Sequence, residues 1–290
     1  MNTRLCCLLL IACPAALSQS KNFGYTNVPD LRAPIRAGSP FTYADLLRQV
    51  CPTFKISRDH ATASVSECVP IRLPGGEDQL ADTPDENASL QSVRTLDVKI
   101  PGKPQLLLMF QLKDEGDEPH QPFDLALFEI ADKPRLLDVV EAPSTPDDTG
   151  DLWSEGLLHL SPTADAFVFE TNHSNSQQGY RSLDVFFAFG GRIQEIADVM
   201  LLSCRGCEDG NFEENVTIAT SPDPGREFNR VTFRVTLDLL PDDPGAEHPK
   251  RTRRSRRLFL GNYRWDAASG RFRDPTHALD ALDPFNKKNY

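Results

Sequence analysis

Short apolar runs alternate with Gly-, Pro- and Asp-rich segments along this chain of 290 residues. The clearest pattern lies at residues 182–200, where Val185, Phe187 and Phe189 occupy alternate positions before Gly190-Gly191. Alternation with a period of two predicts a half-buried strand. A Gly-Gly pair takes the positive φ angles that a two-residue hairpin loop requires. This segment therefore predicts a β-hairpin.

The hairpin pattern occurs again at residues 123–140 and, more loosely, at residues 257–274. Each hairpin follows a further apolar run, at residues 105–112, 166–171 and 230–240. The turns recur roughly every 60 to 80 residues, which is typical of a structural repeat. No helical pattern separates the runs, so we expect a mainly β fold, an antiparallel meander of three diverged three-stranded units. A curved open sheet, a sandwich and a partial propeller-like arc all fit this pattern.

One amphipathic segment precedes the repeats. Residues 43–50 place Leu46, Leu47 and Val50 on one helical face, with Thr42 positioned as the N-cap, so we expect a short helix there. A second short helix is expected at residues 276–282. The predicted organisation is a leader at 1–18, an N-terminal arm and small α/β cap at 19–90, the β-repeat domain at 91–275 and a C-terminal tail at 276–290.

Alternation within the predicted strands also assigns the core. The expected core positions are Leu107, Met109, Leu125, Leu127, Phe167, Phe169, Phe187, Phe233, Val235 and Phe259. In the last hairpin, Tyr263 and Trp265 share a face, and we expect that face to be buried.

The N-terminus is typical of an export signal. A basic start is followed by an apolar stretch at residues 5–12, too short to span a bilayer, and by small residues that favour cleavage near Ser18 or Ser20. Leu10-Ile11-Ala12-Cys13 also resembles a bacterial lipobox, which implies removal of residues 1–12 and lipidation of Cys13. Both alternatives predict an exported protein, periplasmic or secreted, and lipid-anchored in the second case. No other segment is apolar over a membrane-spanning length, so no transmembrane helix is expected in the mature chain.

The net charge of −11 argues against general nucleic-acid binding, which requires a positive field. A basic run nevertheless interrupts the acidic chain. Its cations are Lys250, Arg251, Arg253, Arg254, Arg256 and Arg257. The simplest interpretation is a solvated loop entering the next strand. Contact with an anionic partner, such as phospholipid, lipopolysaccharide or the acidic loops of the chain itself, is the alternative.

Four cysteines follow the leader, at Cys51, Cys68, Cys204 and Cys207. An even number in an exported protein suggests disulfides, and proximity in sequence favours Cys51–Cys68 and Cys204–Cys207. The Cys204-x-x-Cys207 spacing also suggests a thiol–disulfide exchange activity. That activity is disfavoured, because the pair follows a predicted strand and precedes acidic residues, whereas a working pair lies at a helix N-terminus that lowers the thiol pKa.

One polar loop has the composition of a ligand site. Residues 172–180 contain Asn172, His173, Asn175, Gln177 and Tyr180, and amides, an imidazole and an aromatic ring are common in contacts with sugars or peptides. The alternative is an ordinary hydrophilic hairpin loop, which we favour.

No recognised catalytic motif, metal-ligand spacing or cofactor-binding glycine loop occurs, so we assign no catalytic residue, metal site or cofactor. The leading hypothesis is a non-catalytic protein of the bacterial envelope, a binding or structural β-domain whose partner is a protein, a glycan or an envelope lipid. The alternative is a secreted hydrolase using carboxylates in a β-sheet cleft. It predicts carboxylates of raised pKa clustered in one pocket.

Overall fold

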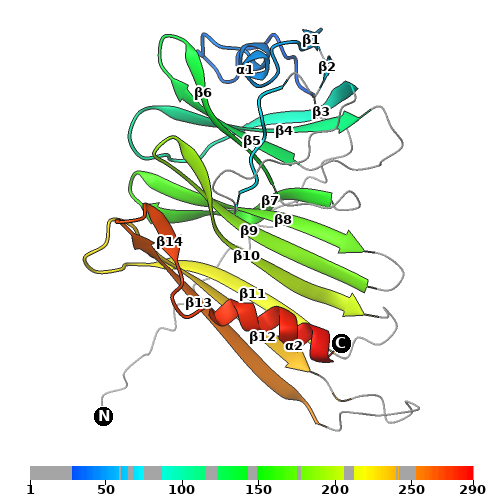
Figure 1. Ribbon diagram of the computed structural model, residues 1–290, viewed down its shortest axis with the longest axis vertical. Coiled ribbons are helices and arrows are strands. Elements are labelled where there is room, and N and C mark those ends of the chain that lie inside the picture. The colour runs from blue at the N-terminus through cyan, green and yellow to red at the C-terminus, as the bar shows by residue number, and fades with distance from the viewer. Residues whose placement is uncertain are drawn as a thin grey trace, which may run out of the picture.

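The computed structural model describes residues 28–58, 60–64, 68–74, 87–114, 123–142, 149–174, 178–205, 212–239, 241 and 253–289. Its strands form three antiparallel sheets, and Figure 1 shows these sheets lying one upon another in a row. Within each sheet, strands that follow one another in sequence are neighbours, as in a meander. The predicted mainly β, antiparallel fold is confirmed.

The first sheet has six strands, and the helix α1 (Tyr43–Val50) packs against it. Its strands are β1 (Lys55–Ile56), β2 (Ala61–Ser64), β3 (Asn87–Leu96), β4 (Gln105–Asp114), β5 (Phe123–Ile130) and β6 (Pro134–Glu141). The second sheet contains β7 (Thr149–Ser161), β8 (Ala164–Ser174), β9 (Gln178–Phe189) and β10 (Arg192–Arg205). The third contains β11 (Phe212–Ser221), β12 (Arg230–Leu239), β13 (Ser255–Asp266) and β14 (Arg271–Arg273).

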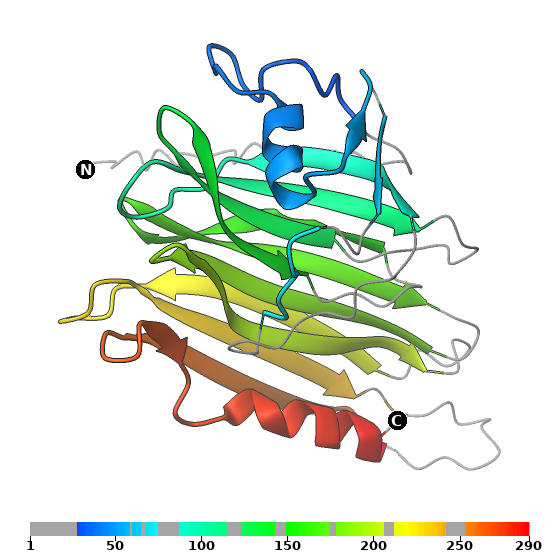
Figure 2. The same cartoon turned by 45° about the horizontal axis from the view of Figure 1, so that its top comes forward.

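The stacking explains why several strands are apolar at consecutive positions. In β4, Leu106, Leu108 and Phe110 pack on the side of α1, whereas Leu107 and Met109 pack against the second sheet. A strand that is covered on both faces needs apolar residues at every position rather than at alternate ones. The first sheet is therefore an inner layer, covered on one face by α1 and on the other by the second sheet (Figure 2).

The second sheet is likewise buried on both faces. Phe167 of β8 and Phe186 of β9 stack at 5.6 Å in the interface with the first sheet. Their neighbours Val168 and Phe187 point to the third sheet. In contrast, β12 alternates buried and partly exposed positions along most of its length, because only one face of the third sheet is covered. Nine of the expected core side chains are buried, and the tenth, Phe259, is partly exposed.

The prediction of three-stranded units was wrong in one respect, because each unit has a further strand in front of it. These strands are β3, β7 and β11. Their sequences are rich in polar residues, and the register of β7 against β8 shifts between Leu152 and Leu157. A bulged or polar strand shows little regular alternation, so the full length of these strands is not apparent from the sequence pattern.

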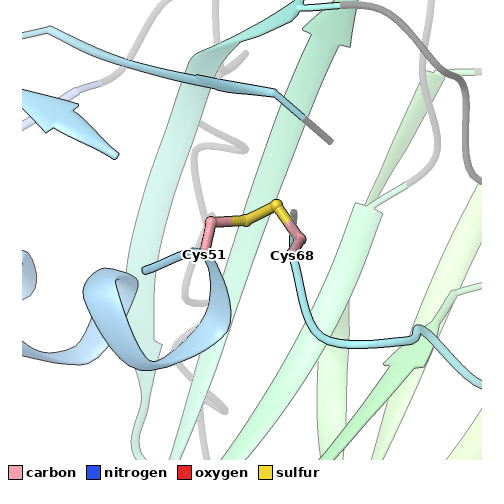
Figure 3. Close-up of a disulfide and its surroundings, with 2 residues drawn as sticks. All are labelled: Cys51 and Cys68. Carbon is pink, nitrogen blue, oxygen red and sulfur yellow. A yellow bond between two sulfur atoms is a disulfide. The ribbon is translucent and has the colours of Figure 1, made fainter. Parts of the chain in front are cut away.

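The predicted N-terminal helix is confirmed, with a capping box at its start. Asp45 N donates to Thr42 Oγ1 at 3.2 Å, and Thr42 N donates to Asp45 Oδ2 at 2.8 Å. The end of the helix is joined to the following segment by a disulfide between Cys51 and Cys68, the first of the two predicted pairs (Figure 3). Because β1 pairs with β2 and β2 pairs with β3, the two short strands extend the first sheet at its edge.

A buried ion pair connects the first and second sheets. Arg72 donates to Asp138 Oδ2 of β6 at 2.6 Å and to the Ile193 carbonyl of β10 at 2.7 Å. Asp138 in turn accepts from Ile193 N at 2.7 Å. The side chains of Arg72 and Asp138 are only 10% and 11% exposed. These hydrogen bonds satisfy both charges at the sheet interface and fix the position of β10 relative to β6.

The C-terminal residues are more helical than expected. The 3-10 helix η2 (Ala278–Ala281) is followed by α2 (Leu282–Asn289), beyond the short helix predicted at 276–282. Phe285 of α2 packs on Phe259 of β13 with ring centroids 5.6 Å apart. At Gly261, an added Cβ would lie 2.8 Å from Leu279 Cδ1, so glycine permits η2 to approach β13 closely.

Candidate functional site

One candidate site is a hollow of about 550 Å³ where loops of all three sheets meet. It is lined by the β7–β8 turn of the second sheet, the β11–β12 turn of the third and Lys99 from the β3–β4 connection of the first. The lining residues are Lys99, His159, Leu160, Ser161, Pro162, Pro222, Asp223, Pro224, Gly225, Arg226, Glu227, Phe228 and Asn229. A volume of this size falls within the range typical of small-ligand sites. We call it the loop hollow.

Hydrogen bonds fix the two turns relative to each other. Asn229 N donates to the Leu160 carbonyl at 2.8 Å, and Asn229 Nδ2 donates to the His159 carbonyl at 3.0 Å. Next to Asn229, Phe228 is only 3% exposed and packs edge-on against Phe187 and Trp265, with centroids 5.1 and 4.9 Å apart. The wall of the loop hollow is thus anchored in the core between the second and third sheets.

His159 is held by a buried carboxylate. Its Nδ1 lies 2.6 Å from Asp165 Oδ1, and the Asp165 side chain is 3% exposed whereas that of His159 is 68% exposed. The other oxygen of Asp165 accepts from Lys99 N at 3.1 Å, so the carboxylate also ties the first sheet to the second. Since a carboxylate is only an acceptor, the neutral imidazole places its proton on Nδ1 and leaves Nε2 as an acceptor.

Asp223 provides a second buried carboxylate at the loop hollow. Its side chain is 9% exposed, and its Oδ2 is buried without a hydrogen-bond partner among the residues described. Arg264 Nε lies 3.9 Å from this oxygen, which is beyond hydrogen-bond distance. Arg226 is turned partly towards the protein, because its Nη1 donates to the Trp265 carbonyl at 2.6 Å. The loop hollow therefore combines acceptors, cations and apolar proline rings.

A separate group of carboxylates lies on β9 and β10. Asp184 stands directly opposite Asp198 in the strand pairing, and it is 1% exposed. Burial, followed by the charges of Glu195 and Asp198, raises the pKa of Asp184 to about 8, and the nearby Ser182 hydroxyl opposes this rise only in part. Burial, followed by the charge of Asp198, raises the pKa of Glu195 to about 7. We call Asp184, Glu195 and Asp198 the acidic group.

The acidic group lies on the face of β9 and β10 that also carries Phe186, but its charges also act on the third sheet. Burial raises the pKa of Tyr263 on β13 to about 12, and the charges of Asp274, Asp198, Asp280 and Glu195 contribute to this rise. Glu195 also lines a small hollow of about 70 Å³. This space is enough for one or two water molecules but not for a sugar ring or a peptide. Carboxylates of raised pKa are therefore clustered, but they lie apart from the loop hollow.

The predicted polar loop is shorter than expected. Strands β8 and β9 extend into it, with His173 opposite Tyr180 and Asn172 opposite Arg181. Asn172 is exposed and Tyr180 is partly buried. Asn175 and Gln177 lie outside the described residues. The structure thus places three of the five predicted residues on paired strands, and none of these three lines the loop hollow.

The second cysteine pair is described only in part. Cys204 lies in β10 opposite Gly179, and Cys207 lies outside the described residues. A bridge between them stays a prediction. The same holds for cleavage of the leader and lipidation of Cys13, because residues 1–27 lie outside the described part.

The basic run supports the third sheet where it is described. Arg256 donates to both oxygens of Asp238, at 2.9 and 2.7 Å, and Arg254 lies 3.2 Å from the same carboxylate. These hydrogen bonds, led by that of Arg256, lower the pKa of Asp238 to about 2. Arg257 lies over the Phe285 ring at 5.6 Å. Arg253 is exposed, and Lys250 and Arg251 lie outside the described residues.

Sequence reasoning did not find the loop hollow. His159 and Asp165 are separated by six residues, and each looks like an ordinary polar residue at a strand end. Only the turn between β7 and β8 brings them together. The one available signal was the cluster Ser221-Pro222-Asp223-Pro224-Gly225, whose composition indicates a turn rather than a site.

Within the described ranges, no group of three or more His, Cys, Asp or Glu side chains is arranged to hold a metal ion. No helix in that part of the chain has both the length and the apolar character to cross a membrane. Comparison of the chain with protein-family models and with curated proteins found no match.

Proposed function

We propose that this protein is an exported envelope protein that binds a small ligand, or an exposed part of a larger partner, in the loop hollow without transforming it. The observation that carries this proposal is the His159–Asp165 pair at the rim of a ligand-sized hollow whose walls are fixed by hydrogen bonds and by core packing. Binding sites are typically concave, largely preformed and lined by apolar surface with a few oriented polar groups. The leader supports export.

The hydrolase alternative draws support from the raised pKa values of Asp184 and Glu195. Two observations favour binding over it. Asp184 is 1% exposed, and the hollow beside Glu195 has a volume of only about 70 Å³. A general acid must come within hydrogen-bond distance of its substrate, either directly or through one water molecule.

Filling the loop hollow is expected to abolish binding. In Ser161→Phe, a ring replaces a hydroxymethyl group on the lining of the hollow. The mature wild type is screened by thermal shift against neutral saccharides, short peptides, phosphates and alkyl amines. At least one class should raise the melting temperature of the wild type and of the control Ser57→Phe, but not that of Ser161→Phe.

Ser57 is an exposed residue next to β1 in the first sheet, so Ser57→Phe tests the same chemical change away from the loop hollow. If Ser161→Phe does not fold, Glu227→Trp replaces it, because Glu227 is exposed and lines the same hollow. The proposal is wrong if no probe distinguishes the wild type from the filled variant. The export component predicts an intact mass for the host-produced protein that lacks residues 1–18, or a lipidated chain beginning at Cys13.

A further inference from the structure

The ligand chemistry of the loop hollow follows from its acceptors. Nδ1 of His159 is occupied by Asp165, and the described residues provide no other hydrogen bond to the ring, so Nε2 of the neutral imidazole is available to accept one. Asp223 adds a carboxylate to the lining, and because its Oδ2 is buried near Arg264, Oδ1 is the oxygen that a ligand would approach. A group that binds between these side chains must donate hydrogen bonds. Hydroxyl groups and alkyl ammonium groups both do so.

The charged residues that line the hollow indicate whether hydroxyl groups or ammonium groups fit it better. Lys99 and Arg226 oppose Asp223 and Glu227, so the formal charges of the lining cancel when His159 is neutral. Because the lining holds two charges of each sign, neither an ammonium ion nor a phosphate gains a net attraction that would offset the loss of its hydration. A neutral ligand with several hydroxyl groups does not carry this penalty, because each hydroxyl donates to an acceptor and accepts from a donor.

The apolar part of the lining also favours a neutral ligand with several hydroxyl groups. Pro162, Pro222 and Pro224 come from the two turns, and Phe228 closes the wall between them. The exposed pyrrolidine rings offer flat apolar surface without hydrogen-bonding groups. One face of a sugar ring is made of C–H groups, whereas its hydroxyls lie at the edge. A saccharide therefore complements both the rings and the polar groups of this hollow.

We infer that the loop hollow binds a neutral saccharide, with His159 Nε2 accepting a hydrogen bond from a sugar hydroxyl and Asp165 acting as the positioning residue that fixes the imidazole. This inference rests on the proposed function, because it names the ligand class of the same site. Asp165 lies behind the ring, where it accepts from Nδ1 and from Lys99 N. It directs the acceptor nitrogen without touching the sugar.

Isothermal titration of the mature protein tests the inference. The probes are neutral trisaccharides of glucose and of N-acetylglucosamine, with inorganic phosphate and 1,4-diaminobutane as the charged comparisons. We expect a trisaccharide to bind and the charged probes not to bind. Removal of one hydrogen bond in His159→Ala should weaken binding about tenfold. Asp165→Asn should weaken it less, because the ring stays but its preferred tautomer is lost.

The matched control is His60→Ala, which removes an exposed imidazole beside β2 in the first sheet and should leave the affinity unchanged. His159→Gln provides a second test that is independent of folding, because the amide keeps an acceptor and should restore part of the affinity lost in the alanine variant. Binding of phosphate or diamine in place of sugar, sensitive to Ser161→Phe, would overturn the saccharide inference and leave the proposed function standing. A trisaccharide that binds equally well to His159→Ala would overturn the role of His159. The absence of binding by both trisaccharides overturns the inference itself, and the thermal-shift screen decides the proposed function separately.

Discussion

Asp184→Asn is expected to make the protein more stable at pH 9 by about 3 kcal/mol and to flatten the dependence of its stability on pH. In the folded wild type the pKa of Asp184 is about 8, against 3.8 as the ordinary value. Between these values the folded state keeps a proton that the unfolded state has released. Stability therefore falls as pH rises from about 4 to about 8.

The expected gain in stability follows from the same two pKa values of Asp184. Each pKa unit corresponds to about 1.4 kcal/mol, so a rise of about four units corresponds to roughly 5 kcal/mol at high pH. Asparagine removes the charge but leaves a buried amide with few partners, which costs about 1–3 kcal/mol. The raised pKa of Glu195 also makes stability fall as pH rises, but over a narrower pH range that ends near pH 7. Some pH dependence should therefore remain in the Asp184→Asn variant.

The measurement is urea unfolding of both proteins at pH 5, 7 and 9. The control is Asp132→Asn, because Asp132 is exposed in the turn between β5 and β6. The control should follow the wild type at every pH. A wild-type stability that rises between pH 5 and 9, or equal slopes for wild type and Asp184→Asn, would show that Asp184 is not protonated in the folded protein.

Phe187→Ala is expected to lower the free energy of unfolding by about 3–5 kcal/mol. Phe187 is fully buried, and its ring packs against Phe228, Trp265 and Phe272 with centroids 5.1, 6.0 and 5.7 Å away. These neighbours come from the β11–β12 turn and from the last hairpin. Truncation would thus leave a cavity between the second and third sheets that rigid neighbours cannot fill.

The adjacent residue, Phe186, applies the same test to the other face of the second sheet. Phe186 is also fully buried, but it faces the first sheet, where it stacks on Phe167. Both Phe186→Ala and Phe187→Ala should therefore destabilise the protein strongly. Leu258→Ala is the control, because Leu258 is 53% exposed and should change stability by no more than about 0.5 kcal/mol. If only one of the two phenylalanine variants were destabilised, the second sheet would be covered on a single face.

The sequence was sufficient to predict the fold class because its hairpins are locally encoded. The Gly190-Gly191 turn has φ angles of 63° and 80°, as the sequence predicted, and the strands on either side pair directly from Phe189 and Arg192 onwards. The Thr42 cap and the Cys51–Cys68 bridge are also local features. Alternation predicted the buried face of β12 and the inward position of Trp265.

What the sequence did not show depends on contacts between segments far apart in the chain. The stacking of three sheets brings Lys99, His159 and Asn229 together, although no local pattern connects them. The predicted ligand loop at 172–180 was selected by composition alone, and the strands β8 and β9 take up most of it. The acidic group was hidden for the same reason, because Asp184 sits between apolar residues and nothing in the sequence marks it as buried.

Hydrogen–deuterium exchange tests the central claim most directly, because it shows where a bound ligand protects the chain. The mature protein is measured with and without a saturating neutral trisaccharide. The account predicts slower exchange in two separate segments, residues 159–165 and 221–229, with little change elsewhere. Protection confined to β9, β10 and β13 would instead place the ligand at the acidic group. That result, or unchanged exchange in both turns, would contradict a binding site in the loop hollow.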